Sequence, residues 1–281
     1  MKIDLIAVDM DGTTLRTDST VSEATINAFA FAAEKGIYVV PTTGRVRDML
    51  PAYVAQLPCI QYAVVSNGAV VMDIKQDVCL YRNILTHQTV CWLYDMVSRY
   101  GCYLEIYWNG QLLSDIRYYY QLETEFQIKK EDADFMRRVV VWKDNLDFLI
   151  HEPQFQAEKF NLLFKSEEAF EKAREELSQN SAIYLSSGTA KALEINNGTA
   201  SKWDGLTALC QHLGICKDNT MCIGDSSNDL TMIQHAGLSV AMANADKRLL
   251  PFADYVTASN DEDGVAQAIY HFIPQKPEKK G

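Results

Sequence analysis

The chain has 281 residues, enough for one large domain or two of ordinary size. Its 48% hydrophobic and 22% charged residues allow a full hydrophobic core and exclude an intrinsically disordered chain. The net charge of −11 argues against nucleic acids and membrane surfaces as partners, because both attract basic patches. Small phosphorylated metabolites stay open as partners, since a metal ion and one or two cations are enough to hold a phosphate.

The first third of the chain alternates apolar runs with amphipathic segments. In chain order it predicts strand 3–8, helix 24–35, strand 37–40, helix 47–56 and strand 62–66. We expect a capping box at Thr20 and Glu23 to open the first helix and Gly36 to end it. This alternation of strands and helices is typical of a parallel α/β sheet.

The middle of the chain has longer segments and more aromatic residues. It predicts helix 89–100, strand 102–108, helix 117–130, strand 160–164 and helix 167–177. The first pattern then returns, with helix 203–213, strand 220–223, helix 229–235 and strands 238–242 and 255–257. We therefore predict an α/β protein with a Rossmann-like parallel-sheet core domain, residues 1–83 and 188–281, interrupted by an inserted α+β cap domain, residues 84–187.

The chain shows no sign of export or membrane insertion. It has seven cysteines without any C-x-x-C pair, which predicts free thiols in a reducing cytosol. The amino-terminal apolar run is too short, and too interrupted by Asp4 and Asp9, for a signal peptide. No stretch approaches the roughly 20 apolar residues of a membrane span. We expect a cytoplasmic protein without membrane attachment.

Four predicted strands are each followed by a polar motif. The motifs are Asp9 to Thr13, Thr42 to Arg45, Asn67-Gly68, and Gly224 to Asp229. The carboxyl ends of parallel strands share one edge of the sheet, and ligands bind beyond it, so we expect these motifs to form one site. The carboxylates on two of them favour a hard divalent cation such as Mg²⁺, which leaves room for a substrate phosphate.

The aspartates after the first strand suggest chemistry at phosphorus. Asp9 is the candidate nucleophile, because a carboxylate can form an aspartyl-phosphate, and Asp11 is the candidate general acid and base. We expect Asp9, Asp225 and the backbone carbonyl of Asp11 to hold Mg²⁺. The hydroxyl of Thr43 and the cation of Lys202 would neutralise the rest of the phosphate charge.

These motifs resemble those of the haloacid dehalogenase-like phosphohydrolases, in particular the Cof-type branch. The matching segments are D-x-D-G-T at 9–13, T-G-R at 43–45, Ser201-Lys202 before a helix, and G-D-x-x-N-D-x-x-M at 224–232. The similarity spans nearly the whole chain, and the insertion falls where that branch carries an α/β cap. Departures at Thr14, Pro41 and Trp203 remove no catalytic group.

The resemblance implies a role for each matched residue. It implies Asp9 as nucleophile and Asp11 as general acid and base. The Mg²⁺ ligands that it implies are Asp9, Asp11 and Asp225, with Asp229 linked to the metal indirectly. The phosphate contacts that it implies come from the Met10 backbone, Thr43, Gly44, Lys202 and Asn228. The implied activity is Mg²⁺-dependent hydrolysis of small phosphorylated metabolites, such as sugar phosphates, beneath the cap.

Other interpretations stay open at this point. Taken alone, Thr43 and Asn228 are ordinary helix-capping residues, and Lys202 is an ordinary solvated lysine at a helix start. For the whole chain, a phosphomutase would form the same aspartyl-phosphate but pass the phosphoryl group to a sugar hydroxyl. A non-enzymatic protein that binds phosphorylated metabolites is the third interpretation.

Overall fold

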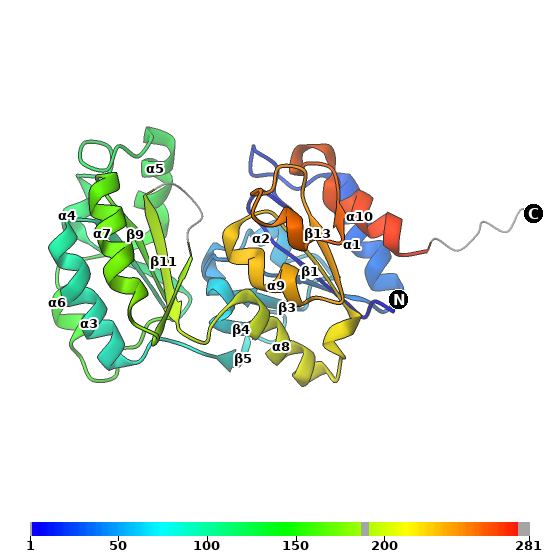
Figure 1. Ribbon diagram of the computed structural model, residues 1–281, viewed down its shortest axis with the longest axis horizontal. Helices are drawn as coiled ribbons and strands as arrows, with labels where there is room; N and C mark the ends of the chain where they lie inside the picture. Colours follow the sequence, from blue (N-terminus) through cyan, green and yellow to red (C-terminus); the bar gives the residue numbers. More distant parts are fainter. Residues whose placement is uncertain (1, 187–190, 275–281) are drawn as a thin grey trace, which may run out of the picture.

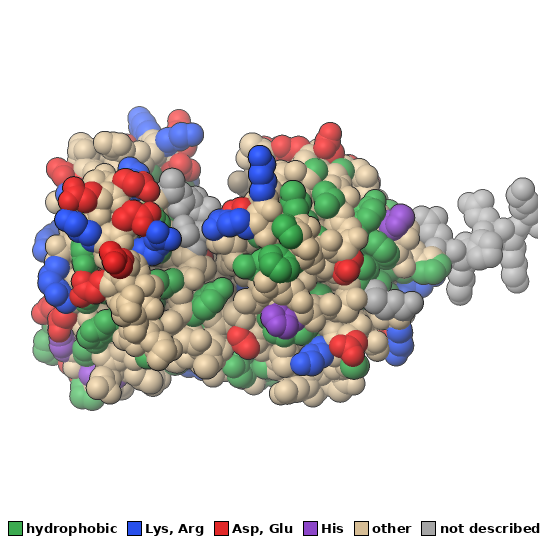
Figure 2. Space-filling view, viewed as in Figure 1, with side chains coloured by type: hydrophobic (Ala, Val, Ile, Leu, Met, Phe, Trp, Pro, Cys, Tyr) green, Lys and Arg blue, Asp and Glu red, His purple; other side chains and the backbone are tan. Residues whose placement is uncertain are grey.

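The computed structural model describes residues 2–186 and 191–274. The described chain forms two lobes, one built on a parallel sheet and one on a mostly antiparallel sheet (Figure 1). The space-filling view shows a notch between the lobes at one edge (Figure 2). None of the described helices combines the length and the apolar character needed to cross a bilayer.

The parallel sheet is the centre of the first lobe. It has five strands in the order β14-β13-β12-β1-β2. Their bounds in chain order are β1 Leu5–Val8, β2 Tyr38–Pro41, β12 Thr220–Gly224, β13 Leu238–Ala241 and β14 Tyr255–Val256. The central pairing joins residues more than 200 positions apart, with Val8 opposite Ile223. The amino- and carboxyl-terminal parts of the chain therefore build one sheet together.

Helices cover both faces of the parallel sheet, as the predicted parallel α/β sheet requires. On one face, Ile6 and Val8 pack in a cluster with side chains from α1 (Glu23–Glu34) and α10 (Gly264–Phe272). On the other face, Leu5 and Ala7 pack with side chains from α8 (Lys202–Leu213) and α9 (Leu230–His235). Burying a leucine or isoleucine side chain contributes roughly 1.5–3 kcal/mol, so this alternation holds β1 firmly in place.

A small antiparallel sheet flanks the parallel one. It consists of β3 (Tyr62–Val65), β4 (Val70–Asp73) and β5 (Val78–Arg82). The sequence predicts that 62–66 continues the parallel sheet, and β3 does run parallel to it, through a bridge between Thr42 and Val64. The chain reverses at Ser66, Asn67 and Gly68, which all have positive φ, and this reversal pairs β3 with β4.

The second lobe is built on six strands in the order β10-β11-β9-β6-β7-β8. Their bounds are β6 Tyr103–Trp108, β7 Gln111–Asp115, β8 Val140–Lys143, β9 Lys159–Leu163, β10 Ile183–Ser186 and β11 Ala192–Asn197. The face away from the first lobe carries the helices α3 His87–Val97, α6 Leu146–Ile150 and α7 Glu167–Ser178 (Figure 1). This helix-covered face holds the lobe's own hydrophobic core.

The predicted domain boundaries stay predictions. Within the described residues, the six-stranded sheet includes β11, although the sequence assigns residues from 188 onward to the core domain. β11 pairs antiparallel with both β9 and β10. The chain returns to the first lobe after Asn197, where α8 begins at Lys202.

Several helices differ from their predicted extents. Helix α1 begins after Ser22, which accepts a hydrogen bond from the Thr25 amide at 3.1 Å, so the capping box predicted at Thr20 and Glu23 is wrong. The Thr20 hydroxyl instead donates to Asp18. The predicted helix 47–56 is divided into a 3-10 turn, Arg47–Met49, and the short α2, Ala52–Ala55. Pro51 causes this break, because it disfavours helical backbone at the residue before it.

The helices of the insertion also differ in position from the predicted ones, and the carboxyl terminus contains one more helix than the sequence predicts. The predicted helix 117–130 is present only as α4 (Ile116–Tyr119), and α5 (Lys130–Val139) starts where it was expected to end. Gln127 has a φ of 56°, which an α-helix cannot include. Helix α10 was not predicted.

Candidate active site

Asp9 lies directly after β1, at the edge of the sheet where the sequence places the site. The chain turns sharply behind it, because the Thr14 amide and hydroxyl both donate to the Asp9 carbonyl, at 3.2 and 2.6 Å. Gly12 makes the turn possible with a φ of 78°, and the Asp225 carboxylate occupies the space where a Cβ would stand. The loop after β1 is thereby packed against the loop after β12.

The loop after β12 carries Asp225 and Asp229. Asp229 is buried, and its Oδ2 accepts from the amides of Asp225 and Ser226, both at 2.9 Å. Asp225 accepts a hydrogen bond from the Thr13 hydroxyl at 2.6 Å. These bonds fix the position of both carboxylates.

Lys202 brings a positive charge to the same place. It is the first residue of α8, after the N-cap Ser201, and its side chain is fully buried. Its Nζ lies 2.5 Å from Asp9 Oδ1 and 2.6 Å from Asp229 Oδ1. The interpretation of Lys202 as a solvated surface lysine is therefore wrong.

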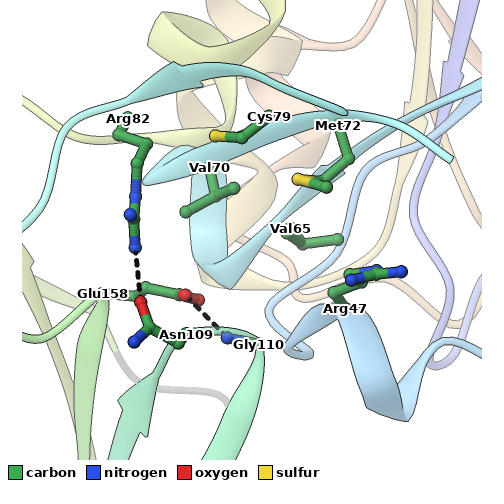
Figure 3. Close-up of a pocket in the computed structure, with 9 residues that line it drawn as sticks. All are labelled: Arg47, Val65, Val70, Met72, Cys79, Arg82, Asn109, Gly110 and Glu158. Atoms are coloured by element: carbon green, nitrogen blue, oxygen red, sulfur yellow. Dashed lines mark hydrogen bonds between the residues drawn. The ribbon is translucent and has the colours of Figure 1, made fainter. Parts of the chain in front are cut away.

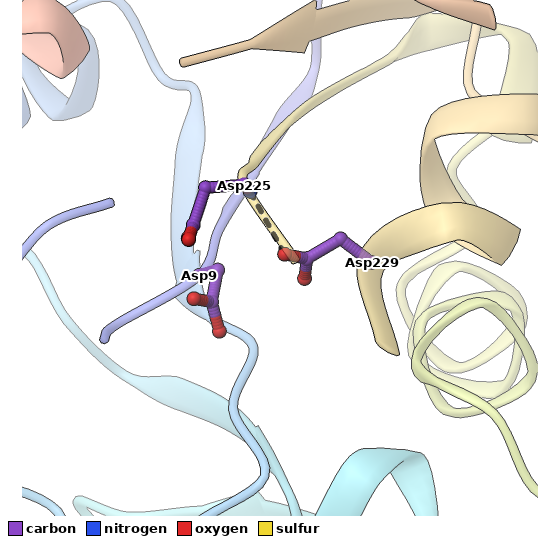
Figure 4. Close-up of side chains that lie close together, drawn as sticks. All are labelled: Asp9, Asp225 and Asp229. Atoms are coloured by element: carbon purple, nitrogen blue, oxygen red, sulfur yellow. Dashed lines mark hydrogen bonds between the residues drawn. The ribbon is translucent and has the colours of Figure 1, made fainter. Parts of the chain in front are cut away.

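Three aspartates form a compact carboxylate cluster. Asp9, Asp225 and Asp229 each offer one carboxylate oxygen, and these oxygens lie within 4.8 Å of one another (Figure 4). Burial, followed by the charge of Asp229, raises the pKa of Asp9 well above its usual value. The same two causes raise the pKa of Asp225 to about 6. The cluster has three carboxylates but only the ammonium of Lys202, which bonds to Asp9 and Asp229, and a divalent cation with oxygen ligands would balance the remaining negative charge.

Asp11 lies outside this cluster. Its side chain is more than half exposed and forms a two-pronged salt bridge with Arg45, from Nε to Oδ2 at 2.8 Å and from Nη2 to Oδ1 at 2.5 Å. Arg45 belongs to the T-G-R motif, so the structure joins two of the predicted motifs here. The acid–base and metal roles of Asp11 stay predictions.

Thr43 and Gly44 lie on the loop beyond β2. The Thr43 amide donates to the Val64 carbonyl at 2.8 Å, and the Thr43 hydroxyl accepts from the Arg45 amide at 3.1 Å. Gly44 is enclosed: a Cβ there would stand 2.7 Å from Asn67 Oδ1 and 3.4 Å from Asn228 Nδ2. Glycine therefore permits the close approach of these loops.

Asn228 and Met10 complete the residues that the sequence singles out. Asn228 Nδ2 donates to Asn67 Oδ1 at 3.1 Å, and Asn228 Oδ1 accepts from the Ser226 hydroxyl at 2.7 Å. The Met10 side chain is fully buried, and the Met10 carbonyl accepts from the Leu15 amide at 2.8 Å. The phosphate-binding roles of these residues stay predictions.

The two lobes also meet away from the aspartates. The hairpin tip Asn109-Gly110, between β6 and β7, rests on the first lobe beside a cavity of about 170 Å³ (Figure 3). Arg82 donates to Asn109 Oδ1 at 3.1 Å, and Glu158 of the second lobe accepts from the Gly110 amide at 2.9 Å and from the Ser66 hydroxyl of the first lobe at 2.6 Å. None of the residues lining this cavity is among the predicted site residues.

Sequence reasoning missed some residues of the site. It gave Asp229 only an indirect link to the metal, and it assigned nothing to Lys159 and Glu194 of the six-stranded sheet. These two residues form a buried ion pair beside Gly44. The available signal was a lysine at the start of a mostly apolar strand, Lys159–Leu163, with a glutamate in β11.

The chain is similar to known hydrolases and phosphatases. A profile of the haloacid dehalogenase-like hydrolases matches residues 6–269. In Bacillus subtilis, 5-amino-6-(5-phospho-D-ribitylamino)uracil phosphatase YcsE is 29% identical, with 96% of each chain covered. Phosphatase YwpJ of the same organism is also 29% identical, with 96% of this chain and 99% of YwpJ covered.

Solved structures show the same fold. A haloacid dehalogenase-like hydrolase from B. subtilis superposes with a TM-score of 0.86 at 24% identity, covering 96% of this chain and all of the other. The sugar phosphatase BT4131, described as subclass IIB, gives a TM-score of 0.81 at 21% identity, covering 97% of this chain and 99% of the other. The family match covers most of the sequence, the α/β fold with a second sheet is shared, and the predicted resemblance is confirmed: this chain belongs to the haloacid dehalogenase-like hydrolases.

Proposed function

We propose that this hydrolase is a Mg²⁺-dependent phosphatase that releases phosphate from small phosphorylated metabolites through an aspartyl-phosphate on Asp9. The observation that carries the proposal is the position of Asp9. It is buried at the carboxyl end of β1, bonded to Lys202 and within the carboxylate cluster. A carboxylate fixed in this way is oriented for attack, which is the main requirement of phosphoryl transfer.

The proposed reaction has two steps. A carboxylate oxygen of Asp9 attacks phosphorus, and the bond between phosphorus and the leaving oxygen breaks while Asp11 donates a proton to that oxygen. Asp11 then takes a proton from water, which attacks phosphorus and releases inorganic phosphate with the Asp9 carboxylate restored. Asp11 must release Arg45 before it can donate to the leaving oxygen, and the exposure of its side chain makes this exchange possible.

The charge balance of the site supports both the metal and the phosphate. Lys202 favours the ionised, nucleophilic form of Asp9 and would contact the phosphate together with Thr43, Gly44, Asn228 and the Met10 amide. When bound, Mg²⁺ would neutralise phosphate charge, held by carboxylates of Asp9 and Asp225 with Asp229 or the Asp11 carbonyl. The all-oxygen donor set of the cluster fits this ion.

The second lobe is proposed as the cap that selects the leaving group. We place its end after β11, at Asn197, because β11 is a middle strand of the six-stranded sheet. The named substrates of YcsE and of BT4131 are a phosphorylated ribityl compound and a sugar phosphate, and both carry phosphate on a hydroxyl-rich chain or ring. We extend this chemical class to the present enzyme. A cytoplasmic location follows for an enzyme of such metabolites, and seven free cysteines suit a reducing compartment.

Phosphate release tests the proposal. The purified protein is assayed against sugar phosphates, ribityl phosphates and nucleotides, with Mg²⁺ and with a chelator. We expect release that depends on Mg²⁺ and favours the hydroxyl-rich esters. An isomerised phosphate ester without free phosphate would identify a phosphomutase, and tight binding without any turnover would identify a binding protein. Either result would overturn the proposal.

A further inference from the structure

A buried ion pair in the second lobe stands apart from that lobe's hydrophobic core. Lys159 on β9 is fully buried, and its Nζ lies 2.5 Å from Glu194 Oε1 on the neighbouring strand β11. The ammonium also lies 4.2 Å from the centre of the Tyr107 ring. Removing a lysine from water is costly unless its charge and its hydrogen bonds are matched, so the partners of this group are informative.

Lys159 reaches across to the first lobe. Its Nζ donates a hydrogen bond to the Gly44 carbonyl at 2.7 Å. Gly44 follows Thr43 on the loop to which the proposed function assigns phosphate binding. A cation of the cap therefore holds the backbone of the predicted phosphate loop, which is also held by the hydrogen bond from the Thr43 amide to Val64.

Glu194 extends the same connection to the loop after β12. Its Oε2 accepts a hydrogen bond from Asn67 Nδ2 at 3.0 Å, and Asn67 Oδ1 accepts from Asn228 Nδ2 at 3.1 Å. Although burial disfavours the charged form, Lys159 lowers the pKa of Glu194 below its usual value, so the carboxylate is ionised near neutral pH. The chain of contacts runs from the cap to Asn228 without a gap.

The pair faces the site rather than the core of its own lobe. Phe160 and Ile195, the sequence neighbours of Lys159 and Glu194, point into the helix-covered hydrophobic cluster. Because side chains alternate along a strand, Lys159 and Glu194 lie on the opposite face of the sheet, towards the first lobe. The second lobe therefore keeps its hydrophobic core whether or not these two side chains are charged.

We propose that Lys159 is a positioning residue, supplied by the cap, that sets the geometry of the phosphate pocket when the lobes are together. With Glu194 it fixes the Gly44 carbonyl and the Asn67 amide, and through them Thr43 and Asn228. Cap docking and an ordered phosphate pocket then become one event. The inference rests on the proposed function for the identity of the ligand, inorganic phosphate or a phosphate ester.

This role predicts a specific pattern of effects on substrate binding and turnover. Lys159 acts on the phosphate end of the substrate, so its loss should lower kcat/KM for every substrate by the same factor. The loss should also weaken the binding of inorganic phosphate, which has no leaving group. A residue that recognises the leaving group would instead affect substrates unequally and leave phosphate affinity unchanged. A purely structural residue would lower the melting temperature and change neither the affinity nor the turnover of the folded protein.

The test compares K159M with K165M. Lys165 is the matched control, because it is also a cap lysine bonded to a glutamate, Glu125, but its ion pair is exposed and lies within the second lobe. Binding of inorganic phosphate with Mg²⁺ is measured by titration calorimetry, and kcat/KM is measured for two esters with different leaving groups. We expect K159M to lose roughly 10- to 100-fold in phosphate affinity and in both kcat/KM values, with K165M unchanged.

A second variant guards against a folding defect. K159M leaves Glu194 without its bonded cation, whereas K159M/E194Q removes both charges of that ion pair. We expect the double variant to recover the wild-type melting temperature but not the phosphate affinity, because the donor to Gly44 is still missing. Wild-type phosphate affinity in a folded K159M or K159M/E194Q would overturn the inference.

The calorimetric measurement separates this inference from the proposed function. A wild-type protein that binds phosphate but hydrolyses no ester contradicts the proposed function alone. Wild-type turnover combined with unchanged phosphate binding in the variants contradicts the inference alone. Losses that differ between the two esters, with phosphate affinity intact, also contradict it and assign Lys159 to the leaving group.

Discussion

Each lobe buries a lysine among carboxylates, and the two clusters differ in their balance of charge. In the first lobe, Lys202 faces Asp9, Asp225 and Asp229, and the pKa values of Asp9 and Asp225 are raised by burial and by Asp229. In the second lobe, Lys159 is paired with Glu194, and the pKa of Glu194 is lowered. The first cluster has an excess of negative charge, which suits metal binding and catalysis. The second pairs one lysine with one glutamate, which suits a fixed contact between the lobes.

Removing the nucleophile should have the largest effect. Asp9→Asn is nearly the same shape but cannot form the acyl phosphate, so we expect kcat to fall by roughly 10⁴-fold or more. The melting temperature should not fall, because the substitution removes one charge from a cluster that has too many. The control is Asp77→Asn, because Asp77 is an exposed aspartate of the first lobe that pairs with Arg47. This variant should keep full activity. Substantial Mg²⁺-dependent turnover by Asp9→Asn would contradict the assignment of Asp9.

Removing Lys202 should show that the two clusters differ in how Mg²⁺ affects the stability of the protein. Lys202→Met leaves three facing carboxylates without a cation, and we expect a loss of about 3–5 kcal/mol in urea unfolding with chelator present. Mg²⁺ should restore a large part of this loss, since it supplies the missing positive charge. The same addition should not rescue Lys159→Met, where the carboxylate left unpaired, Glu194, lies outside the metal cluster. Equal responses of the two variants to Mg²⁺ would break the comparison.

The pH dependence of stability should have opposite signs in the two clusters. A carboxyl whose folded pKa is raised stabilises the fold below its unfolded pKa, and this contribution is lost as pH rises through the folded value. For Asp225 the window is about pH 4 to 6, and a shift from 3.8 to about 6 corresponds to something on the order of 3 kcal/mol. The metal-free protein should therefore lose stability across this window, and the stabilisation by Mg²⁺ should grow with pH.

Glu194 should give a pH dependence of stability with the opposite sign. Its folded pKa is lowered, so its contribution is present above its unfolded value of about 4.5 and is lost as pH falls through the folded pKa. Glu194→Gln should therefore differ from the wild type most at neutral pH and least in acid. Melting curves from pH 4 to 7.5, with and without Mg²⁺, measure both effects. A Mg²⁺ effect independent of pH would contradict the explanation given for Asp225.

The exposed ion pairs should matter least. Lys165 and Glu125 are each partly solvated, and such pairs contribute about 0–1 kcal/mol. We expect Lys165→Met to change the free energy of unfolding by less than ~0.5 kcal/mol, and high salt to reduce even this difference. A loss as large as that of Lys159→Met would show that burial is not what distinguishes the two lysines.

The sequence predicts the first cluster well because its signals are local. Asp9 follows an apolar run, Asp225 follows another, and the rule that ligands bind beyond the carboxyl ends of parallel strands brings the two together. The role of Lys202 could be predicted only from all the motifs together, since a lysine at a helix start is ordinarily solvated. The structure adds that Asp229, rather than the Asp11 carboxylate, completes the group of three facing oxygens.

The second cluster and the small antiparallel sheet were beyond sequence reasoning. Lys159 and Glu194 lie on strands that meet only in the folded sheet, and no periodicity links a lysine to a carbonyl on another lobe. The strand β3 itself was predicted, but its pairing with β4 was not, because the reversal after β3 depends on left-handed backbone at Ser66 and Asn67, which strand propensity does not reveal. The helix predicted at 117–130 failed for a similar reason at Gln127.

The pairing of β1 with β12 has a consequence for synthesis. Asp9 leaves the ribosome early, but the strand beside it and the carboxylates opposite it are made more than 200 residues later. The second lobe is contiguous and can fold while the remainder of the first is still being translated, since domains generally fold as units. The nucleophile therefore acquires its neighbours only near the end of translation, and a truncated chain would carry Asp9 without a reactive centre.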